Sequence, residues 1–217
     1  MITLQSLLNG YSKFQKHASP EEIAQLKRLR DGQSPEVLMI TCSDSRVHLE
    51  RILQYKPGEV FTIRNAGNVV PGLKSEARGE LGTLQFAVEV LKIKNIVVCG
   101  HSDCGAVKAA LNPTVIETLP HLKSWIAEAK DGFNPCNDDD LNSNIQKHVL
   151  NQIDRLNQLD FIASRVKLGA LTLSAWMLNI GDAEIISFCD QDGKWRPLDQ
   201  RPQPYLRAIG ASEGAFK

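Results

Sequence analysis

The chain has 217 residues, of which 42% are hydrophobic and 23% are charged, and its formal net charge is zero. The length suits one domain, and the composition is that of an ordinary globular protein. Zero net charge argues against a protein that binds nucleic acid or anionic membranes through its overall charge. It also weakens the repulsion between copies of the chain, which favours an oligomer.

The N-terminal segment MITLQSLLNGYSKFQKH lacks a basic region followed by a long apolar run. We therefore expect no signal peptide, and no segment is apolar over the length that a membrane span requires. The cysteines form an odd and scattered set, which argues against a disulfide framework and predicts a cytoplasmic protein. They are Cys42, Cys99, Cys104, Cys136 and Cys189.

Apolar residues at helical spacing predict two helices, over residues 2–17 and 20–31. We interpret residues 1–32 as an N-terminal helical arm. After the breaker DGQSP, the run EVLMITC predicts a buried strand that ends at Cys42. The segment CSDSRVHLERIL then predicts a loop that becomes a short helix.

The segment GEVFTIRNAGN predicts a second strand, which ends in a turn at Asn65–Asn68. Residues 76–92 have a helical pattern, and NIVVC predicts a third buried strand before a helix over residues 105–111. Residues 119–130 and 143–167 are also predicted to be helical.

Two further strands, GALTLSAWMLNI and AEIISFC, are predicted to pair around the turn at Gly181 and Asp182. Residues 198–217 are interpreted as a C-terminal extension. Strands that alternate with helices predict an α/β fold with a mostly parallel central sheet flanked by helices. We expect a single domain over residues 1–217.

Three of the predicted strands end in reactive residues. Ligands bind beyond the carboxyl ends of parallel strands, and CSDSR, RNAGN and GHSDC all lie at such ends. His101 and Cys104 are three residues apart, so one short turn can present both to a metal ion. Cys42 joins them if its strand is a neighbour in the sheet. Two thiolates and an imidazole are typical zinc ligands.

Asp44 follows Cys42 by two residues and can reach the same ion. Three protein ligands leave a position open for water, whereas a fourth protein ligand closes the site. Arg46 can hold the Asp44 carboxylate through two hydrogen bonds and keep it off the metal. Asp44 could therefore switch the site between a closed and an open state, and in the open state orient a zinc-bound hydroxide.

Other interpretations of these residues remain open. Cys104 could be a reactive thiol, since a helix start lowers the pKa of a thiol, but Cys42 and Asp44 would then have no role. A non-catalytic zinc site closed by Asp44 would leave Arg46 idle. The remaining cysteines are interpreted as small buried apolar residues.

The segments ITCSDSRV, FTIRNAGNVVP and VVCGHSDCGAV together closely resemble the β-class carbonic anhydrases. The resemblance extends from about Tyr11 to Pro197. It implies an enzyme, a zinc lyase that catalyses the reversible hydration of CO2 to bicarbonate and a proton through a zinc-bound hydroxide. Relatives of this fold hydrolyse CS2 or COS at a similar zinc site, so these substrates are the alternative.

The resemblance also assigns roles at the reactive strand ends. It implies that Cys42, His101 and Cys104 bind one Zn2+ per subunit. Asp44 and Arg46 would form the catalytic dyad, and Asp44 would be a fourth zinc ligand in an inactive state.

The resemblance further implies which residues line the substrate pocket. Family members use a glutamine and two aromatic residues, which usually reach in from a partner subunit, and Gln33, Phe61 and Phe86 occupy those places. Ala66 and the backbone N–H of Gly105 would complete the pocket. The implied assembly is a homodimer or a dimer of dimers, with the N-terminal arm packed on a partner subunit.

The chain departs from the family pattern in two respects. Phe86 stands where the family often has tyrosine, so a hydroxyl group is lost. Some bacterial members bind bicarbonate at a non-catalytic site made of a tryptophan, an arginine and a tyrosine. Here those places hold Met39, Arg64 and Leu178, and we predict that this chain lacks that bicarbonate switch.

Overall fold

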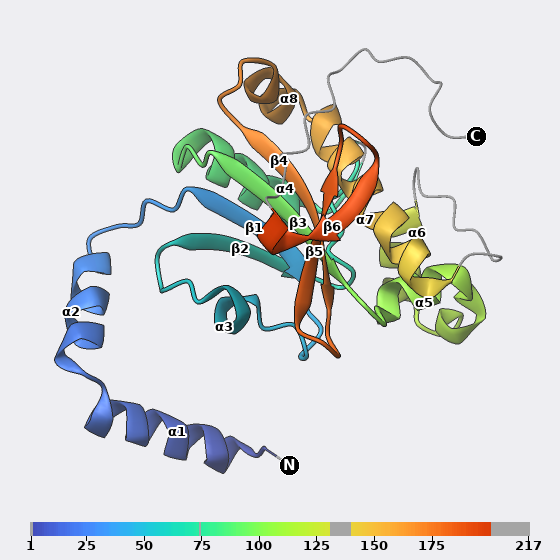
Figure 1. Ribbon diagram of the computed structural model, residues 1–217. Coiled ribbons are helices and arrows are strands. Elements are labelled where there is room, and N and C mark those ends of the chain that lie inside the picture. The colour runs from blue at the N-terminus through green and yellow to red at the C-terminus, as the bar shows by residue number, and fades with distance from the viewer. Residues whose placement is uncertain (1, 74, 131–139, 201–217) are drawn as a thin grey trace. The chain divides into compact units, whose positions relative to one another are not determined.

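The computed structural model describes residues 2–73, 75–130 and 140–200 (Figure 1). By its internal contacts the chain divides into two compact units, Met1–Ser34 and Pro35–Lys217. The boundary lies two residues beyond the predicted end of the helical arm. None of the helices in the described residues is long and apolar enough to cross a membrane.

The first unit contains the two predicted helices, α1 (Leu4–His17) and α2 (Pro20–Leu29). Each begins at a capping box, in which a hydroxyl accepts from a backbone N–H and a polar side chain three residues later returns a bond. Ser19 and Glu22 form the capping box of α2, with Pro20 at its first position. Neither helix has a buried residue.

The second unit is built on a six-stranded sheet with the strand order β2-β1-β3-β4-β5-β6. The strands β2, β1, β3 and β4 run parallel to one another, whereas β5 pairs antiparallel with both β4 and β6. The predicted mostly parallel sheet is therefore confirmed. The strands are β1 (Val37–Cys42), β2 (Val60–Asn65), β3 (Asn95–His101), β4 (Thr172–Asn179), β5 (Glu184–Cys189) and β6 (Lys194–Pro197).

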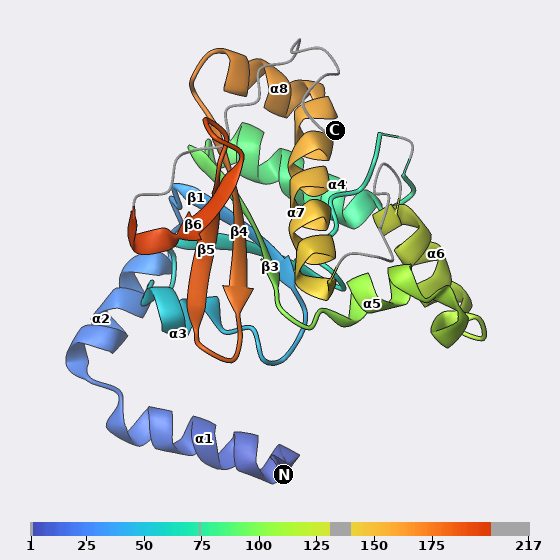
Figure 2. The same cartoon turned by 45° about the vertical axis from the view of Figure 1, so that its right-hand side comes forward.

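Helices cover both faces of this sheet (Figure 2). On one face α4, α7 and α8 pack on the strands, and on the other face α3 does so. The bounds are α3 (Leu49–Leu53), α4 (Arg78–Gln85), α5 (Gly105–Leu111), α6 (Pro120–Lys130), α7 (Leu141–Gln158) and α8 (Asp160–Lys167), with shorter turns η1 (Phe86–Val90), η2 (Pro113–Ile116) and η3 (Leu198–Gln200).

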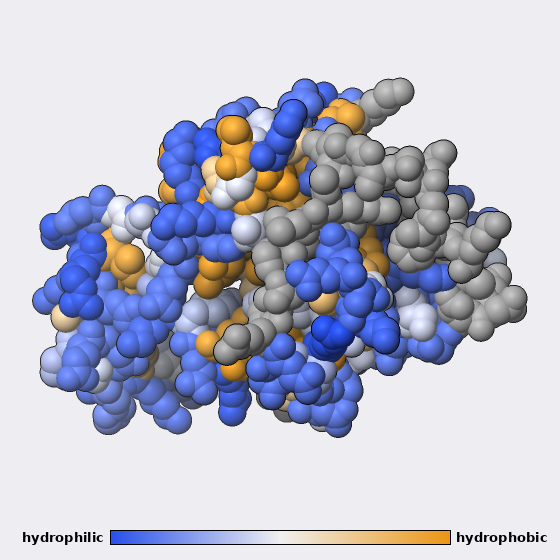
Figure 3. Space-filling view, turned by 45° about the horizontal axis from the view of Figure 1, so that its top comes forward, coloured by the Kyte–Doolittle hydropathy of each residue, from blue (hydrophilic) through white to orange (hydrophobic). Residues whose placement is uncertain are grey.

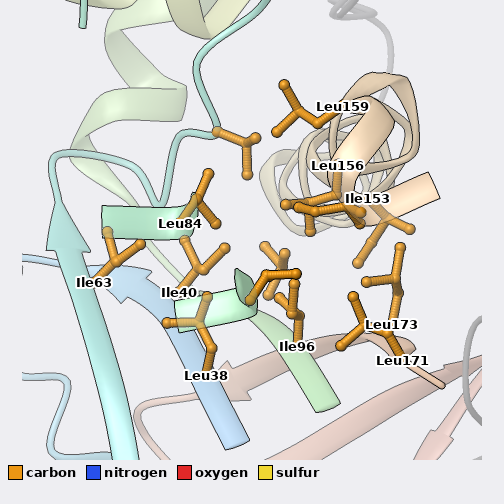
Figure 4. Close-up of a cluster of buried hydrophobic side chains, with 14 of the residues drawn as sticks. Leu38, Ile40, Ile63, Leu84, Ile96, Ile153, Leu156, Leu159, Leu171 and Leu173 are labelled. Atoms are coloured by element: carbon orange, nitrogen blue, oxygen red, sulfur yellow. The ribbon is translucent and has the colours of Figure 1, made fainter. Parts of the chain in front are cut away.

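The main core lies between the sheet and the helices α4, α7 and α8 (Figure 4). Leu38 and Ile40 of β1 and Ile96 of β3 meet Ile153 and Leu156 of α7, and all five are fully buried. Burying a side chain of this size contributes about 1.5–3 kcal/mol. Hydrophobic residues also reach the surface in places (Figure 3).

The structure differs from the sequence prediction at several element ends. The helix predicted over 143–167 is broken at Leu159, whose extended backbone separates α7 from α8. The pattern over 76–92 forms α4 followed by the π-helical turn η1. The strand β6 was not predicted, and of the predicted C-terminal extension only η3 lies within the described residues.

The sheet places the reactive strand ends at one edge. In the parallel register Cys42 pairs with Asn65, and the preceding Thr41 pairs with Cys99. The ends of β1, β2 and β3 therefore lie side by side. Gly100 in β3 allows α7 to approach closely, because a Cβ there would lie 2.5 Å from Cγ2 of Val149.

Candidate metal centre

Cys42, His101 and Cys104 come together at the carboxyl edge of the sheet. Cys42 ends β1, His101 ends β3, and Cys104 immediately precedes α5. Their ligand atoms lie within 4.8 Å of one another, and all three residues are buried. Zinc bonds to sulfur at about 2.3 Å and to imidazole nitrogen at about 2.0–2.1 Å. One ion can therefore reach all three donors with small adjustments.

The imidazole of His101 is oriented for a metal. Its Nδ1 lies 2.9 Å from the carbonyl oxygen of Ser102, so Nδ1 carries the proton and donates. Its Nε2 is buried and has no hydrogen-bond partner among the described residues. Burying an acceptor without a hydrogen-bond partner lowers the stability of the fold. A metal ion would supply the missing partner, because two adjacent thiols and an imidazole nitrogen are a suitable set of metal ligands.

The two thiols at the centre are electrostatically unequal. The pKa of Cys42 is lowered to about 4, chiefly because Cys104 donates a hydrogen bond to it. That same bond and burial raise the pKa of Cys104. The hydrogen bond between the two thiols favours the thiolate form at Cys42, and thiolates are the form that binds metals.

The remaining cysteines lack this environment. Cys99 is fully buried in β3, and burial raises the pKa of its thiol to about 12. Cys189 is also buried, and both are free thiols. The interpretation of these two as buried apolar residues is confirmed, whereas Cys136 lies outside the described residues.

Asp44 and Arg46 form the bidentate pair that the sequence suggested. Nε of Arg46 lies 3.0 Å from Oδ1 of Asp44, and Nη2 lies 2.7 Å from Oδ2. The backbone N–H of Arg46 also donates to Oδ1. These bonds hold the pKa of Asp44 well below its usual range. Oδ2 of Asp44 is 4.0 Å from Nε2 of His101, so the carboxylate stands beside the metal ligands.

A second carboxylate, which sequence reasoning missed, holds the other side of Arg46. Oδ2 of Asp103 accepts from Nη1 of Arg46 at 2.9 Å, and the Asp103 carbonyl accepts from Nη2. Lys108 of α5 also pairs with Asp103. Asp103 has a positive φ of 62°, a conformation that aspartate tolerates better than most residues. Arg46 is thus fixed between two carboxylates.

The turn after β2 supplies a backbone donor to the centre. The side chain of Asn65 closes this turn, since it donates to the Val69 carbonyl and accepts from the Val69 N–H. Gly67 has a φ of 86°, and its N–H donates to Sγ of Cys42 at 3.3 Å. A hydrogen bond to sulfur stabilises the thiolate, so the RNAGN segment supports the candidate metal centre.

Two residues from distant helices hold this turn, and sequence reasoning assigned neither to the site. Nε1 of Trp125 in α6 donates to the Ala66 carbonyl at 2.7 Å. Nε2 of His148 in α7 lies 2.8 Å from the Gly67 carbonyl, to which it donates. Burial lowers the pKa of His148 to about 4, so the imidazole is neutral at pH 7.

The residues predicted to line the substrate pocket fall into three groups. Ala66 and Gly105 lie beside the metal ligands, in the turn after β2 and at the start of α5. The rings of Phe61 and Phe86 contact each other, with centroids 6.1 Å apart. Phe61 is paired with Leu38, four residues before Cys42, so these rings are not at this chain's own metal ligands. Gln33 is an exposed residue of the first unit.

The guanidinium of Arg64 donates hydrogen bonds to backbone carbonyls beside the candidate metal centre. Its Nε donates to the Cys42 carbonyl at 3.1 Å, and its Nη2 donates to the carbonyls of Asp44 and Val47, both at 3.0 Å. Met39 and Leu178 are buried in the apolar cluster on the α3 face of the sheet.

Comparison with known proteins agrees with this geometry. The sequence model of the carbonic anhydrase family matches residues 37–185. A carbonic anhydrase of Pseudomonas aeruginosa is 34% identical over 97% of this chain and 98% of its own length. The solved β-carbonic anhydrase CcaA has a TM-score of 0.82 at 31% identity, and the match covers 89% of this chain and 98% of that chain. One of two tetrameric β-carbonic anhydrases from Sordaria macrospora has a TM-score of 0.69 at 29% identity, covering 84% and 93%. This chain therefore belongs to the β-class carbonic anhydrases, a family of enzymes.

Proposed function

We propose that this protein catalyses the reversible hydration of CO2 to bicarbonate and a proton at a zinc ion held by Cys42, His101 and Cys104. The observation that carries the proposal is the buried, unpartnered Nε2 of His101, which lies within 4.8 Å of two buried thiols. Membership of the carbonic anhydrase family supports the reaction.

Zinc suits this donor set better than the other common metals. Two thiolates and one imidazole favour a borderline-soft ion, and three protein ligands leave the fourth position for water. When bound, zinc supplies a Lewis acid that lowers the pKa of a coordinated water toward neutrality. We expect one zinc ion per chain.

Asp44 and Arg46 have complementary roles in this proposal. Both carboxylate oxygens of Asp44 accept hydrogen bonds from Arg46, so the carboxylate is held back from the ligand position it could otherwise occupy. Because its pKa is low, Asp44 is ionised and can accept a hydrogen bond from the attacking oxygen. It thereby orients a lone pair of that oxygen toward the CO2 carbon, while Arg46 keeps the orientation fixed.

The pocket would be completed by a second copy of the chain. Ala66 and the N–H of Gly105 lie on the same chain as the metal ligands, whereas Gln33, Phe61 and Phe86 would come from a partner. The exposure of Phe86 (43%) and Val90 (62%) on η1 supports an interface there. The tetrameric assembly of the Sordaria macrospora enzymes supports a homodimer or a dimer of dimers.

The alternatives are weaker. Hydrolysis of CS2 or COS would use the same ligands, but the relatives reported above are named carbonic anhydrases. A site permanently closed by Asp44 would not need the paired arginine, which here occupies both carboxylate oxygens. A thiol enzyme that uses Cys104 would leave Cys42, His101 and Asp44 beside it without a role.

Stopped-flow CO2 hydration with a pH indicator, on zinc-loaded protein at about pH 8.5, tests the proposal. Asp44→Asn and Arg46→Met should each lower kcat by at least about 100-fold, since a positioned proton acceptor typically contributes that much. Lys94→Met is the matched control, because it removes an exposed cation that pairs with Glu36 at the opposite end of β1 and β3. Zinc-loaded wild type without CO2 hydration, or equal loss in the control, would overturn the proposal. CS2 and COS should be assayed in parallel.

A further inference from the structure

We propose that Trp125 is a positioning residue for the metal centre: its indole N–H fixes and polarises the Ala66–Gly67 peptide, whose own N–H stabilises the Cys42 thiolate. This inference rests on the proposed function, because it requires a metal at Cys42. Trp125 lies in α6, a helix that supplies no metal ligand, and it would affect the charge and position of the Cys42 sulfur from there.

Two hydrogen bonds link Trp125 to Cys42 through one peptide unit. Nε1 of Trp125 donates to the Ala66 carbonyl at 2.7 Å. The N–H on the other side of that same peptide is the Gly67 N–H, which donates to Sγ of Cys42 at 3.3 Å. The indole, the peptide and the thiolate are therefore linked by a continuous chain of hydrogen bonds that ends on a metal ligand of the proposed site.

The far side of Gly67 is held by packing and by a hydrogen bond. Gly67 has a φ of 86° and packs so tightly on α5 that a Cβ there would lie 2.6 Å from Cβ of Ala106. On its other side, the Gly67 carbonyl accepts from His148 of α7 at 2.8 Å. Trp125 adds the hydrogen bond to the carbonyl of the preceding peptide, the one that carries the N–H to sulfur.

The electrostatic consequence follows from the direction of these bonds. A donor on a peptide carbonyl polarises the N–H of that peptide, and such chains of hydrogen bonds strengthen one another. A stronger donor at the sulfur draws charge from the thiolate and lowers its basicity. Groups that hydrogen-bond a metal ligand typically alter metal affinity or activity by 10–100-fold when removed. Trp125 acts one bond further away, so we expect the lower end of that range.

The test uses cobalt, whose bond to thiolate gives a charge-transfer band that reports the energy of the sulfur lone pair. In Trp125→Phe the indole donor is lost, so the sulfur carries more charge and the band should move to lower energy. The zinc dissociation constant should rise about tenfold, because the Ala66–Gly67 peptide is no longer held and its N–H no longer fixes the position of Sγ of Cys42. Replacement of Trp125 by 3-benzothienylalanine is the sharper variant, because it exchanges only the N–H for sulfur and keeps the ring shape. Both changes should give the same direction of shift.

Trp176→Phe is the matched control. Nε1 of Trp176 is buried but has no hydrogen-bond partner within the described part of the chain, so this variant loses ring volume without losing a hydrogen bond. An unmoved band and an unchanged zinc affinity in the folded benzothienyl variant would overturn the inference. An equal shift in Trp176→Phe would also overturn it. If wild type showed no thiolate-to-cobalt band, the metal site itself would be refuted, which separates failure of the proposed function from failure of the inference.

Discussion

Gly67→Ala tests whether the turn after β2 is built to bring its N–H to the metal thiolate. Two costs can be worked out from the structure. The left-handed φ of 86° costs an alanine about 1–2 kcal/mol. The new Cβ would also lie 2.6 Å from Cβ of Ala106, and overpacking of this kind costs about 1–3 kcal/mol. We therefore expect a loss of about 2–5 kcal/mol in the free energy of unfolding.

Gly169→Ala provides the matched control, since Gly169 has a φ of 68° but nothing within 4 Å of its virtual Cβ. It should lose only the conformational cost of about 1–2 kcal/mol. The assay is urea unfolding of the reduced apoprotein at pH 7, with zinc affinity measured by chelator competition. Only Gly67→Ala should weaken zinc binding, because only there is the N–H to Cys42 displaced. Equal destabilisation of the two variants, with unchanged zinc affinity in both, would refute the reasoning.

Three further predictions follow from the same structure. Burial lowers the pKa of His148 from 6.5 to about 4. As the pH falls from 6.5 to 4, the unfolded chain therefore binds a proton at this histidine before the folded chain does. The free energy of unfolding should fall over this range, by about 3 kcal/mol at pH 4. Urea titrations of apoprotein should show a flatter pH dependence in His148→Gln, and an unaltered slope would count against the burial argument. The pKa of Asp44 is lowered by Arg46. The pair therefore stabilises the fold at pH values above those at which an ordinary carboxyl group titrates, and this stabilisation is lost as Asp44 becomes protonated in acid. The gap in urea midpoint between wild-type apoprotein and Asp44→Asn should therefore shrink from pH 6 to pH 3, and a constant gap would contradict the pairing. Finally, the buried, apolar Met39 and Leu178 stand where the bicarbonate site of some bacterial family members has its tryptophan and tyrosine, so bicarbonate inhibition of hydration should be hyperbolic, whereas a steeply sigmoidal curve would show a bicarbonate switch.

The grouping of the candidate metal ligands could be predicted because local patterns determine it. Apolar runs that end at Cys42 and His101 predict parallel strands, and such strands deliver their last residues to a common edge. The three ligand residues and the pairing of Asp44 with Arg46 depend on spacings of two or three residues, which a sequence displays directly.

The supporting residues could not be predicted, because their partners lie far away along the chain. His148 reaches a carbonyl 81 residues earlier, and Trp125 reaches one 59 residues earlier. On its helix each resembles an ordinary core or surface residue. The break at Leu159 was also missed, because the apolar spacing continues through it while the backbone becomes extended. The short strand β6 has only four residues and too little pattern to identify.

The most direct test of the account is a zinc titration of the apoprotein, with CO2 hydration followed by stopped flow after each addition. We predict no hydration above background in the apoprotein, a linear rise in the hydration rate per total protein with added zinc, and a sharp plateau at one zinc per chain. Cys104→Ala should bind zinc far more weakly and show no such plateau. Hydration without zinc, or a protein with one tightly bound zinc per chain and no hydration, would contradict the assignment of Cys42, His101 and Cys104 as the catalytic metal centre.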